Sequence, residues 1–168
     1  MSNDAPTTQY FSHSPMVIAN NILKRSFDDD VPVNAMKLQK LLYFVASEYS
    51  KQADGHQLFE ERFKTWRYGP VLRSLYDKTA VLEGDPLRKY LKDAQGRNFT
   101  MKETHQPELR SALDRVWRHG KHLTAAELAR ITHLPDSAWT KAHTAGFVEL
   151  NPVDITADTS YILSLNLI

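Results

Sequence analysis

Apolar and polar positions along the chain recur mostly with the 3.6-residue period of α-helices. The clearest example runs from Ala35 to Asp54, where no Gly or Pro interrupts the pattern and Asn34 precedes it as a good N-cap. One stripe of this predicted helix is apolar and consists of Leu38, Leu42, Val45, Ala46 and Tyr49. The opposite face is polar and consists of Lys37, Lys40, Ser47, Glu48 and Lys51. The pattern therefore predicts an amphipathic helix.

Phe44 lies in the middle of the polar face of this predicted helix. In one interpretation, another element covers the helix there and the lysines extend their alkyl chains around the ring. In the other, Phe44 is an exposed anchor of a partner-binding patch, ringed by Lys37, Lys40 and Lys51. Aromatic and cationic residues are typical of interface centres. The pattern alone leaves both interpretations open.

Local start and stop signals predict further helices around this one. They are a helix from Ser14–Pro15 to about Phe27, one from Gly69–Pro70 to Gly84, one from Pro107 to Gly120, one capped by Thr124 with Glu127, and a short one from Pro135–Ser137 containing Trp139. A short strand within 58–68 and a weak hairpin over 87–101 are the predicted β elements. Residues 147–168 are ambiguous between helix and strand. We therefore expect a mainly α fold with a small β-hairpin element.

Residues 123–150 have the pattern of a winged helix-turn-helix, in which the second helix, Ser137–Thr144, would enter the major groove of DNA. The charges argue against that role. Residues 121–150 carry three bases and three acids, and the second helix offers only Lys141 besides a histidine. A protein that reads the groove normally neutralises several phosphates. We expect a winged-helix-like architecture without DNA binding, and a DNA-binding operon regulator is the alternative.

The length of 168 residues fits one domain, which we place at 14–168 behind a flexible polar arm at 1–13. The chain has no Cys, which excludes disulfides, thiolate nucleophiles and Cys-ligated metals. No apolar run approaches the roughly 20 residues of a membrane helix, so a cytoplasmic protein without membrane contact is expected. The net charge is +1, but residues 86–121 hold nine bases and four acids. That basic segment could face a protein or a nucleic acid.

Known catalytic and metal-binding motifs do not occur in the sequence. There is no HExxH motif, and the nearest histidine pair, His119 and His122, straddles Gly120 at a predicted helix end. Glycine-rich phosphate loops and the nucleophile elbow of hydrolases are missing as well. Neighbouring acids such as Glu60 and Glu61 are typical of solvated loops. We expect a protein that is not an enzyme and uses no cofactor and no metal.

Two sequence blocks resemble the Panacea domain of the SocA-like antitoxins, which are also described as phage-associated. The first is Met36-Lys37-Leu38-Gln39-Lys40-Leu41-Leu42-Tyr43-Phe44, and the second is Trp66-x-Tyr68-Gly69-Pro70-Val71 with Leu75-Tyr76 downstream. Weaker matches follow at Val116-Trp117, Gly120, Leu128, Thr132-His133 and Ser137-Ala138-Trp139. Together they cover about 16–146.

The resemblance implies an antitoxin of a type II toxin-antitoxin system that neutralises a co-encoded protein toxin by direct contact. Toxins paired with this family include small alarmone-synthetase-like enzymes that block translation, and one member is associated with delivery of its toxin to the ClpXP protease. The family has no catalytic residues to transfer. We expect toxin contacts at exposed neighbours of the shared motifs: Lys37, Lys40, Phe44, Lys51, Trp66, Arg67, Tyr68 and Arg73.

Overall fold

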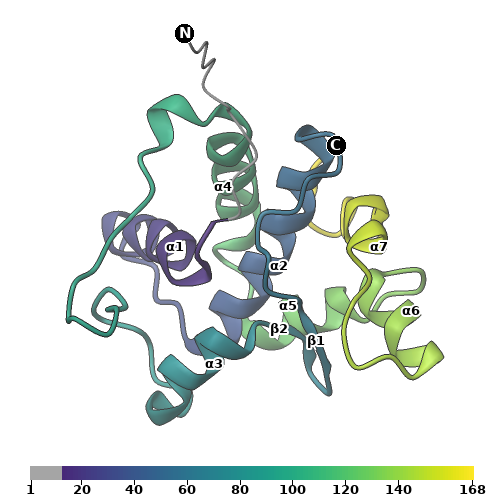
Figure 1. Ribbon diagram of the computed structural model, residues 1–168, viewed down its shortest axis with the longest axis horizontal. Coiled ribbons are helices and arrows are strands. Elements are labelled where there is room, and N and C mark those ends of the chain that lie inside the picture. Colours follow the sequence, from purple (N-terminus) through teal and green to yellow (C-terminus); the bar gives the residue numbers. More distant parts are fainter. Residues whose placement is uncertain (1–12) are drawn as a thin grey trace, which may run out of the picture.

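A computed structural model describes residues 13–168, so the predicted arm lies outside the described residues except for His13. One long helix, α2 (Ala35–Gln52), runs through the middle, and the other elements surround it (Figure 1). These are α1 (Pro15–Asp29), β1 (Lys64–Trp66), β2 (Gly69–Val71), α3 (Arg73–Thr79), the 3-10 turns η1 (Ala80–Leu82) and η2 (Glu103–His105), α4 (Pro107–Gly120), α5 (Ala125–Thr132), α6 (Ala138–Ala145) and α7 (Pro152–Ala157). The predicted fold class, mainly α with a small β element, is confirmed.

Helix α2 forms where the sequence predicts it, but it is not amphipathic in the fold. The Asn34 side chain caps its start by accepting a hydrogen bond from the Lys37 backbone N–H at 2.9 Å. Every residue from 37 to 50 is buried, because α1, α3, α4, α5, α7 and β2 all contact this helix. The polar face therefore faces protein rather than solvent.

The C-terminal part of the chain covers the second half of that polar face and bonds to Ser47, Glu48 and Lys51. The Tyr43 hydroxyl donates to an Asp158 carboxylate oxygen at 2.5 Å, and the Tyr161 hydroxyl donates to Glu48 at 2.6 Å. Arg115 on α4 donates to the other Glu48 oxygen at 2.9 Å. Buried polar groups are tolerated when they are paired in this way. The ambiguous segment 147–168 thus consists of one short helix and turns that seal the domain.

The β-hairpin lies where a helix start was predicted. β1 and β2 are antiparallel, with Trp66 opposite Gly69 and Lys64 opposite Val71. Gly69 has φ +115°, a left-handed conformation incompatible with a helix. The prediction of a helix beginning at Gly69–Pro70 is therefore wrong, and α3 begins at Arg73 instead.

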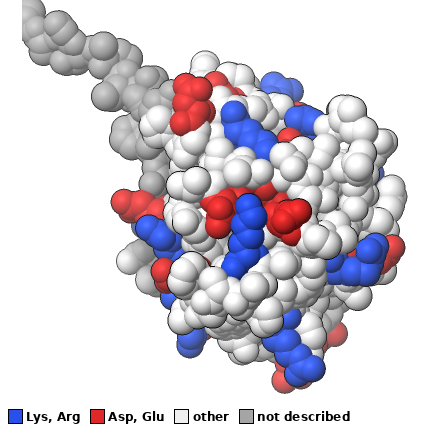
Figure 2. Space-filling model, turned by 90° about the vertical axis from the view of Figure 1, so that its right-hand side faces the viewer, with Lys and Arg blue, Asp and Glu red and all other residues white. Residues whose placement is uncertain are grey.

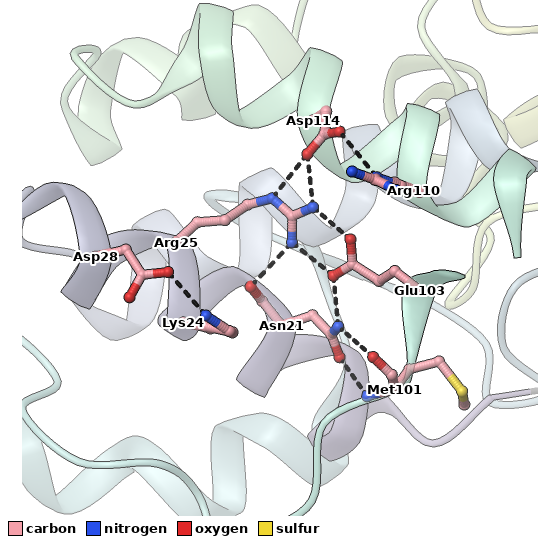
Figure 3. A network of polar contacts seen from close by, with 8 residues as sticks. All are labelled: Asn21, Lys24, Arg25, Asp28, Met101, Glu103, Arg110 and Asp114. Atoms are coloured by element: carbon pink, nitrogen blue, oxygen red, sulfur yellow. Dashed lines mark hydrogen bonds and ion pairs between the residues drawn. The ribbon is translucent and has the colours of Figure 1, made fainter. Parts of the chain in front are cut away.

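The predicted hairpin over 87–101 is also wrong, because the segment forms a turn at 93–97 but no paired strands, and its flanks bond to α1. Asn20 Nδ2 donates to the Leu91 carbonyl at 3.0 Å, and the Leu91 N–H donates to Asn20 Oδ1 at 2.8 Å. Asn21 makes the same pair of bonds with Met101, at 2.9 and 2.7 Å (Figure 3). Each amide thus replaces a strand neighbour.

An arginine on α1 secures the end of the same segment. Arg25 lies between two carboxylates, with its guanidinium 2.6 Å from Glu103 and 2.6 Å from Asp114 (Figure 3). The guanidinium is largely buried, so these bonds are less screened than surface ion pairs. Segment 86–106 is therefore fixed to the helices along its length, including bonds from Asn20 to Phe99 and from Lys78 to Lys92, although it has no strand of its own.

Helices α5 and α6 form the predicted helix-turn-helix. Thr124 and Glu127 make the predicted capping box, with bonds of 3.0 and 2.9 Å, and Ser137 caps α6. The chain after α6 does not form a hairpin of its own as a wing would. It continues the sheet through a bridge between Glu149 and Lys64 of β1. None of the described helices is both long and apolar enough to cross a membrane.

Candidate partner-binding groove

A groove of about 620 Å³ opens between the first turns of α2, the turn of the β-hairpin, and α3 with η1. Ligand sites in proteins are typically concave, mostly apolar and roughly 300–1,000 Å³ in volume. We call this feature the aromatic groove, and its walls include Met36, Lys40, Trp66, Tyr68, Val71 and Tyr76. Tyr68 is 55% exposed and Tyr76 is 44% exposed, so part of the aromatic surface remains uncovered.

Two polar side chains of α2 fix the hairpin that forms one wall of the aromatic groove. Gln39 makes two bonds to Leu72: its Nε2 donates to the carbonyl at 3.0 Å, and its Oε1 accepts from the backbone N–H at 2.9 Å. Lys40 Nζ donates to the Pro70 carbonyl at 3.0 Å. These bonds explain physically why a Gln-Lys pair in the first motif accompanies Gly-Pro-Val in the second.

Gly69 is required next to the turn of the hairpin for reasons of space and conformation. A Cβ atom there would lie 2.6 Å from Thr132 Oγ1 and 3.1 Å from Lys40 Cε. Its φ of +115° is also one that L side chains rarely adopt. Glycine therefore allows the hairpin to approach both α2 and α5.

Aromatic rings and guanidinium groups pack on each other around the turn. The Trp66 and Tyr76 rings meet edge to face, with centroids 4.8 Å apart. The Arg73 guanidinium lies 5.9 Å from the Trp66 ring, and that of Arg67 lies 5.3 Å from the Tyr68 ring. These are cation–π distances. The turn presents a surface that is both aromatic and positively charged.

The turn is supported from behind by α5 and α6. Trp139 Nε1 donates to the Trp66 carbonyl at 2.8 Å, and a His133 ring nitrogen lies 3.2 Å from the Arg67 carbonyl. The Trp139 ring is itself packed between His133 and His143, with centroids 3.9 and 4.6 Å away. Two carbonyls of the turn are thus fixed before any partner binds, which lowers the entropic cost of binding.

Burial of Lys40 changes its electrostatic behaviour. The side chain is 1% exposed, and loss of solvation lowers the pKa of its amine to about 7. Arg67 and Arg73 are exposed, and Arg73 pairs with Asp77 at 3.0 Å. The walls of the groove therefore hold one buried amine, that of Lys40, and one exposed guanidinium, that of Arg67. Arg73 lies next to the groove, beside Trp66.

The predicted contact residues divide into two groups in the structure. Trp66, Arg67 and Tyr68 come together in the turn, and Arg73 lies beside them at the start of α3. Lys40 lines the same groove but is buried rather than exposed. The second motif therefore supplies the accessible part of the candidate site.

The prediction that α2 presents an exposed patch around Phe44 is wrong. Phe44 is fully buried, 5.1 Å from the Tyr161 ring and 5.6 Å from the Tyr43 ring. The first interpretation of Phe44, in which another element covers it, is the correct one. The covering element is the C-terminal segment, more than 100 residues further along the chain.

Two lysines expected around Phe44 also point into the protein. Lys37 is 7% exposed, and its Nζ donates to the Lys121 carbonyl. Lys51 Nζ donates to the Asp158 carbonyl at 2.5 Å and to the Tyr161 hydroxyl at 3.0 Å, and burial lowers its pKa. Both amines replace solvent with protein acceptors, so neither forms a cationic surface around an exposed ring.

Sequence reasoning missed two residues of the aromatic groove, Met36 and Tyr76. Met36 begins the first motif but lies outside the apolar stripe of α2, so periodicity gave it no role. Tyr76 was assigned to the inward face of a helix beginning at Gly69. Because α3 begins at Arg73, Tyr76 instead lies in its first turn and faces Trp66.

The face that carries α6 and α7 differs from the aromatic groove in charge. In Figure 2 this side is mostly uncharged, and its Lys and Arg side chains are mixed with Asp and Glu rather than forming a continuous basic area. The exposed positions of α6 include one base, Lys141. Within residues 13–168, no three His, Asp or Glu side chains gather closely enough to hold a metal ion.

Comparison with known proteins identifies the class to which this fold and groove belong. The family model described as "Antitoxin SocA-like, Panacea domain" matches residues 38–140, a range that contains most of α2, the hairpin and α5. The chain belongs to this family of antitoxins.

A curated member of the family supports the same assignment. Antitoxin SocA of Caulobacter vibrioides (strain NA1000 / CB15N) is 25% identical over 126 residues, which is 73% of this chain and 66% of the relative. This alignment therefore spans slightly less than two thirds of the curated protein. No solved structure matches the chain.

Proposed function

We propose that this protein is the antitoxin of a type II toxin-antitoxin system and neutralises a co-encoded protein toxin by direct binding, without catalysis. The observation that carries the proposal is the aromatic groove, which is built by the two sequence blocks of the family. Membership of an antitoxin family supports the general role. The groove supplies the surface that such a role requires.

The composition of the aromatic groove favours a protein partner. Interface centres are enriched in Tyr, Trp, Met and Arg, and a few such residues carry most of the binding energy. Met36, Trp66, Arg67, Tyr68 and Tyr76 all line this groove. The hydrogen bonds behind the turn hold these groups in place before binding, and the arginines steer an acidic toxin surface toward them.

The family resemblance extends the proposal to the toxin. We propose a translation inhibitor of the small alarmone-synthetase-like class, whose nucleotide site or a neighbouring surface the antitoxin covers or distorts. Direct binding predicts neutralisation in cells that lack ClpXP. Neutralisation that disappears together with ClpXP would identify a protease adaptor instead.

Co-expression with the product of the neighbouring gene tests the proposal. We expect that gene alone to arrest growth, and co-expression of this protein to restore growth and co-purify with the toxin. Tyr68→Glu should abolish both effects, because it places a charge in the exposed aromatic wall. Phe147→Glu is the matched control, since Phe147 is also an exposed aromatic residue, at 61%, but lies after α6 outside the groove. Persistent growth arrest without co-purification would contradict the proposal.

A further inference from the structure

Lys40 is a buried amine with spare hydrogen-bonding capacity in the wall of the aromatic groove. A lysine ammonium has three N–H donors. Among the described residues, Lys40 Nζ donates a hydrogen bond to one acceptor, the Pro70 carbonyl, at 3.0 Å. Loss of solvation lowers its pKa, and Lys40 forms no ion pair with a carboxylate among residues 13–168. A buried ammonium without a counter-charge is costly.

The other polar groups around Lys40 are already engaged within the protein. Gln39 uses its amide on Leu72, the Asn34 side-chain oxygen caps α2, and the Thr79 hydroxyl donates to the Leu75 carbonyl. What remains for an occupant is the apolar and aromatic wall with the Tyr68 and Tyr76 hydroxyls and the Trp66 indole N–H, the spare donors of Lys40, and the exposed guanidinium of Arg67. Glu83 is the one acidic residue in the lining.

This combination selects a specific chemistry. Aromatic walls favour a bulky apolar side chain, ideally an aromatic ring that packs edge to face with Trp66 or Tyr76. A single buried ammonium with one nearby guanidinium matches one carboxylate, and such charge-assisted bonds are among the stronger ones.

We propose that the aromatic groove binds a partner segment that presents a bulky apolar side chain together with a carboxylate, and that the carboxylate accepts hydrogen bonds from Lys40. This inference rests on the proposed function, because it describes what the toxin brings to the groove.

Small probes test this chemistry without knowledge of the toxin. N-acetyl-phenylalanine carries a ring and a carboxylate, and N-acetyl-phenylalanine amide carries the same ring without the charge. Titration of each into the full-length ¹⁵N-labelled protein at pH 6.5 should shift the amide resonances of Met36, Trp66, Tyr68 and Tyr76. We expect the carboxylate probe to bind about tenfold more tightly or better, the size of a hydrogen bond to a charged group.

Two variants assign that preference to Lys40. Lys40→Met keeps the buried chain but removes the amine, so both probes should then bind equally weakly. Lys78→Met is the matched control, because the exposed Lys78 amine bonds to the Lys92 carbonyl outside the groove, and it should retain the preference. Equal binding of the two probes to the unmodified protein overturns the proposal without any variant. Shifts confined to other regions, or no shifts up to about 50 mM probe, also overturn the proposal. A millimolar dissociation constant requires only about 4 kcal/mol of binding free energy, so even weak binding would be detected at that concentration.

The toxin itself separates this inference from the proposed function. If the probes behave as expected but no toxin binds, the groove chemistry stands and the antitoxin role fails. If the toxin binds Lys40→Met as tightly as the unmodified protein, the carboxylate contact is refuted and the antitoxin role stands.

Discussion

Because Lys40 is buried, we predict that its amine makes the free energy of unfolding rise with pH over a limited pH range. Its pKa is about 7 in the folded protein against 10.5 when solvated. Below pH 7 the amine is protonated in both states and adds no pH dependence. Between pH 7 and about 10.5 the unfolded chain holds a proton that the folded chain has released, so the free energy of unfolding increases with pH.

The magnitude follows from the same two pKa values. Each pH unit inside the window contributes about 1.4 kcal/mol, so stability should increase by roughly 2–3 kcal/mol between pH 6.5 and 9. Lys40→Met removes this contribution and leaves the other titrating groups, including Lys37 and Lys51, unchanged. The difference between the two unfolding free energies should therefore grow by that amount.

Urea denaturation of both proteins at half-unit steps from pH 6.5 to 9 measures this difference. Loss of the bond to the Pro70 carbonyl adds an offset that does not depend on pH, so the slope is the informative quantity. Parallel curves for the two proteins would refute the reasoning, because they would mean that Lys40 keeps its proton throughout the range.

Three further predictions test the fold around the groove. Phe44→Ala should lower the free energy of unfolding in urea by about 3–5 kcal/mol, because it leaves a large cavity in the core. Phe44→Asp should abolish the cooperative thermal melt. A near-normal melt for Phe44→Asp would mean that Phe44 is not a core residue. Gly69→Ala should lower the free energy of unfolding by more than 1 kcal/mol. Gly55 also has a positive φ but faces open space, so Gly55→Ala should cost only the conformational strain. Equal losses of stability in the two variants would contradict the steric account of Gly69. The protein should form no specific complex with the DNA upstream of its own gene, and a specific complex whose log affinity falls steeply with log salt would contradict the view of α5–α6 as architecture.

The helices could be predicted from the sequence because their signals are local. Asn34, Pro107, the Thr124–Glu127 capping box and Ser137 all act within one turn, and each marks a helix start in the structure. The same kind of reasoning failed at Gly69–Pro70. There, pairing with β1 and the close approach of Thr132 override a helix-start signature.

Burial of the polar face of α2 could not be predicted because its partners are distant in sequence. Tyr43 bonds to Asp158 and Glu48 bonds to Tyr161, separations of more than 100 residues. The predicted hairpin over 87–101 failed for a similar reason, since the backbone on either side of its 93–97 turn bonds to Asn20 and Asn21 instead of forming paired strands.

Half of the predicted contact residues are accessible in the structure. Trp66, Arg67, Tyr68 and Arg73 follow from the second motif, which sits on a turn and stays accessible. Phe44 and Lys51 were placed by helical periodicity on a face that the C-terminal segment covers, and Lys37 on the same face bonds to the Lys121 carbonyl. Periodicity distinguishes the two faces of a helix but does not show whether a second element packs on the polar one.

The central claim, that the aromatic groove binds the toxin, is tested most directly by the dissociation constant of the purified toxin for three proteins. These are the unmodified chain, Tyr68→Ala and Phe147→Ala. Loss of a central aromatic contact typically costs about 2 kcal/mol or more, so Tyr68→Ala should bind roughly 30-fold more weakly while Phe147→Ala binds as before. Unchanged affinity for Tyr68→Ala, or a larger loss for Phe147→Ala, would place the toxin on another surface.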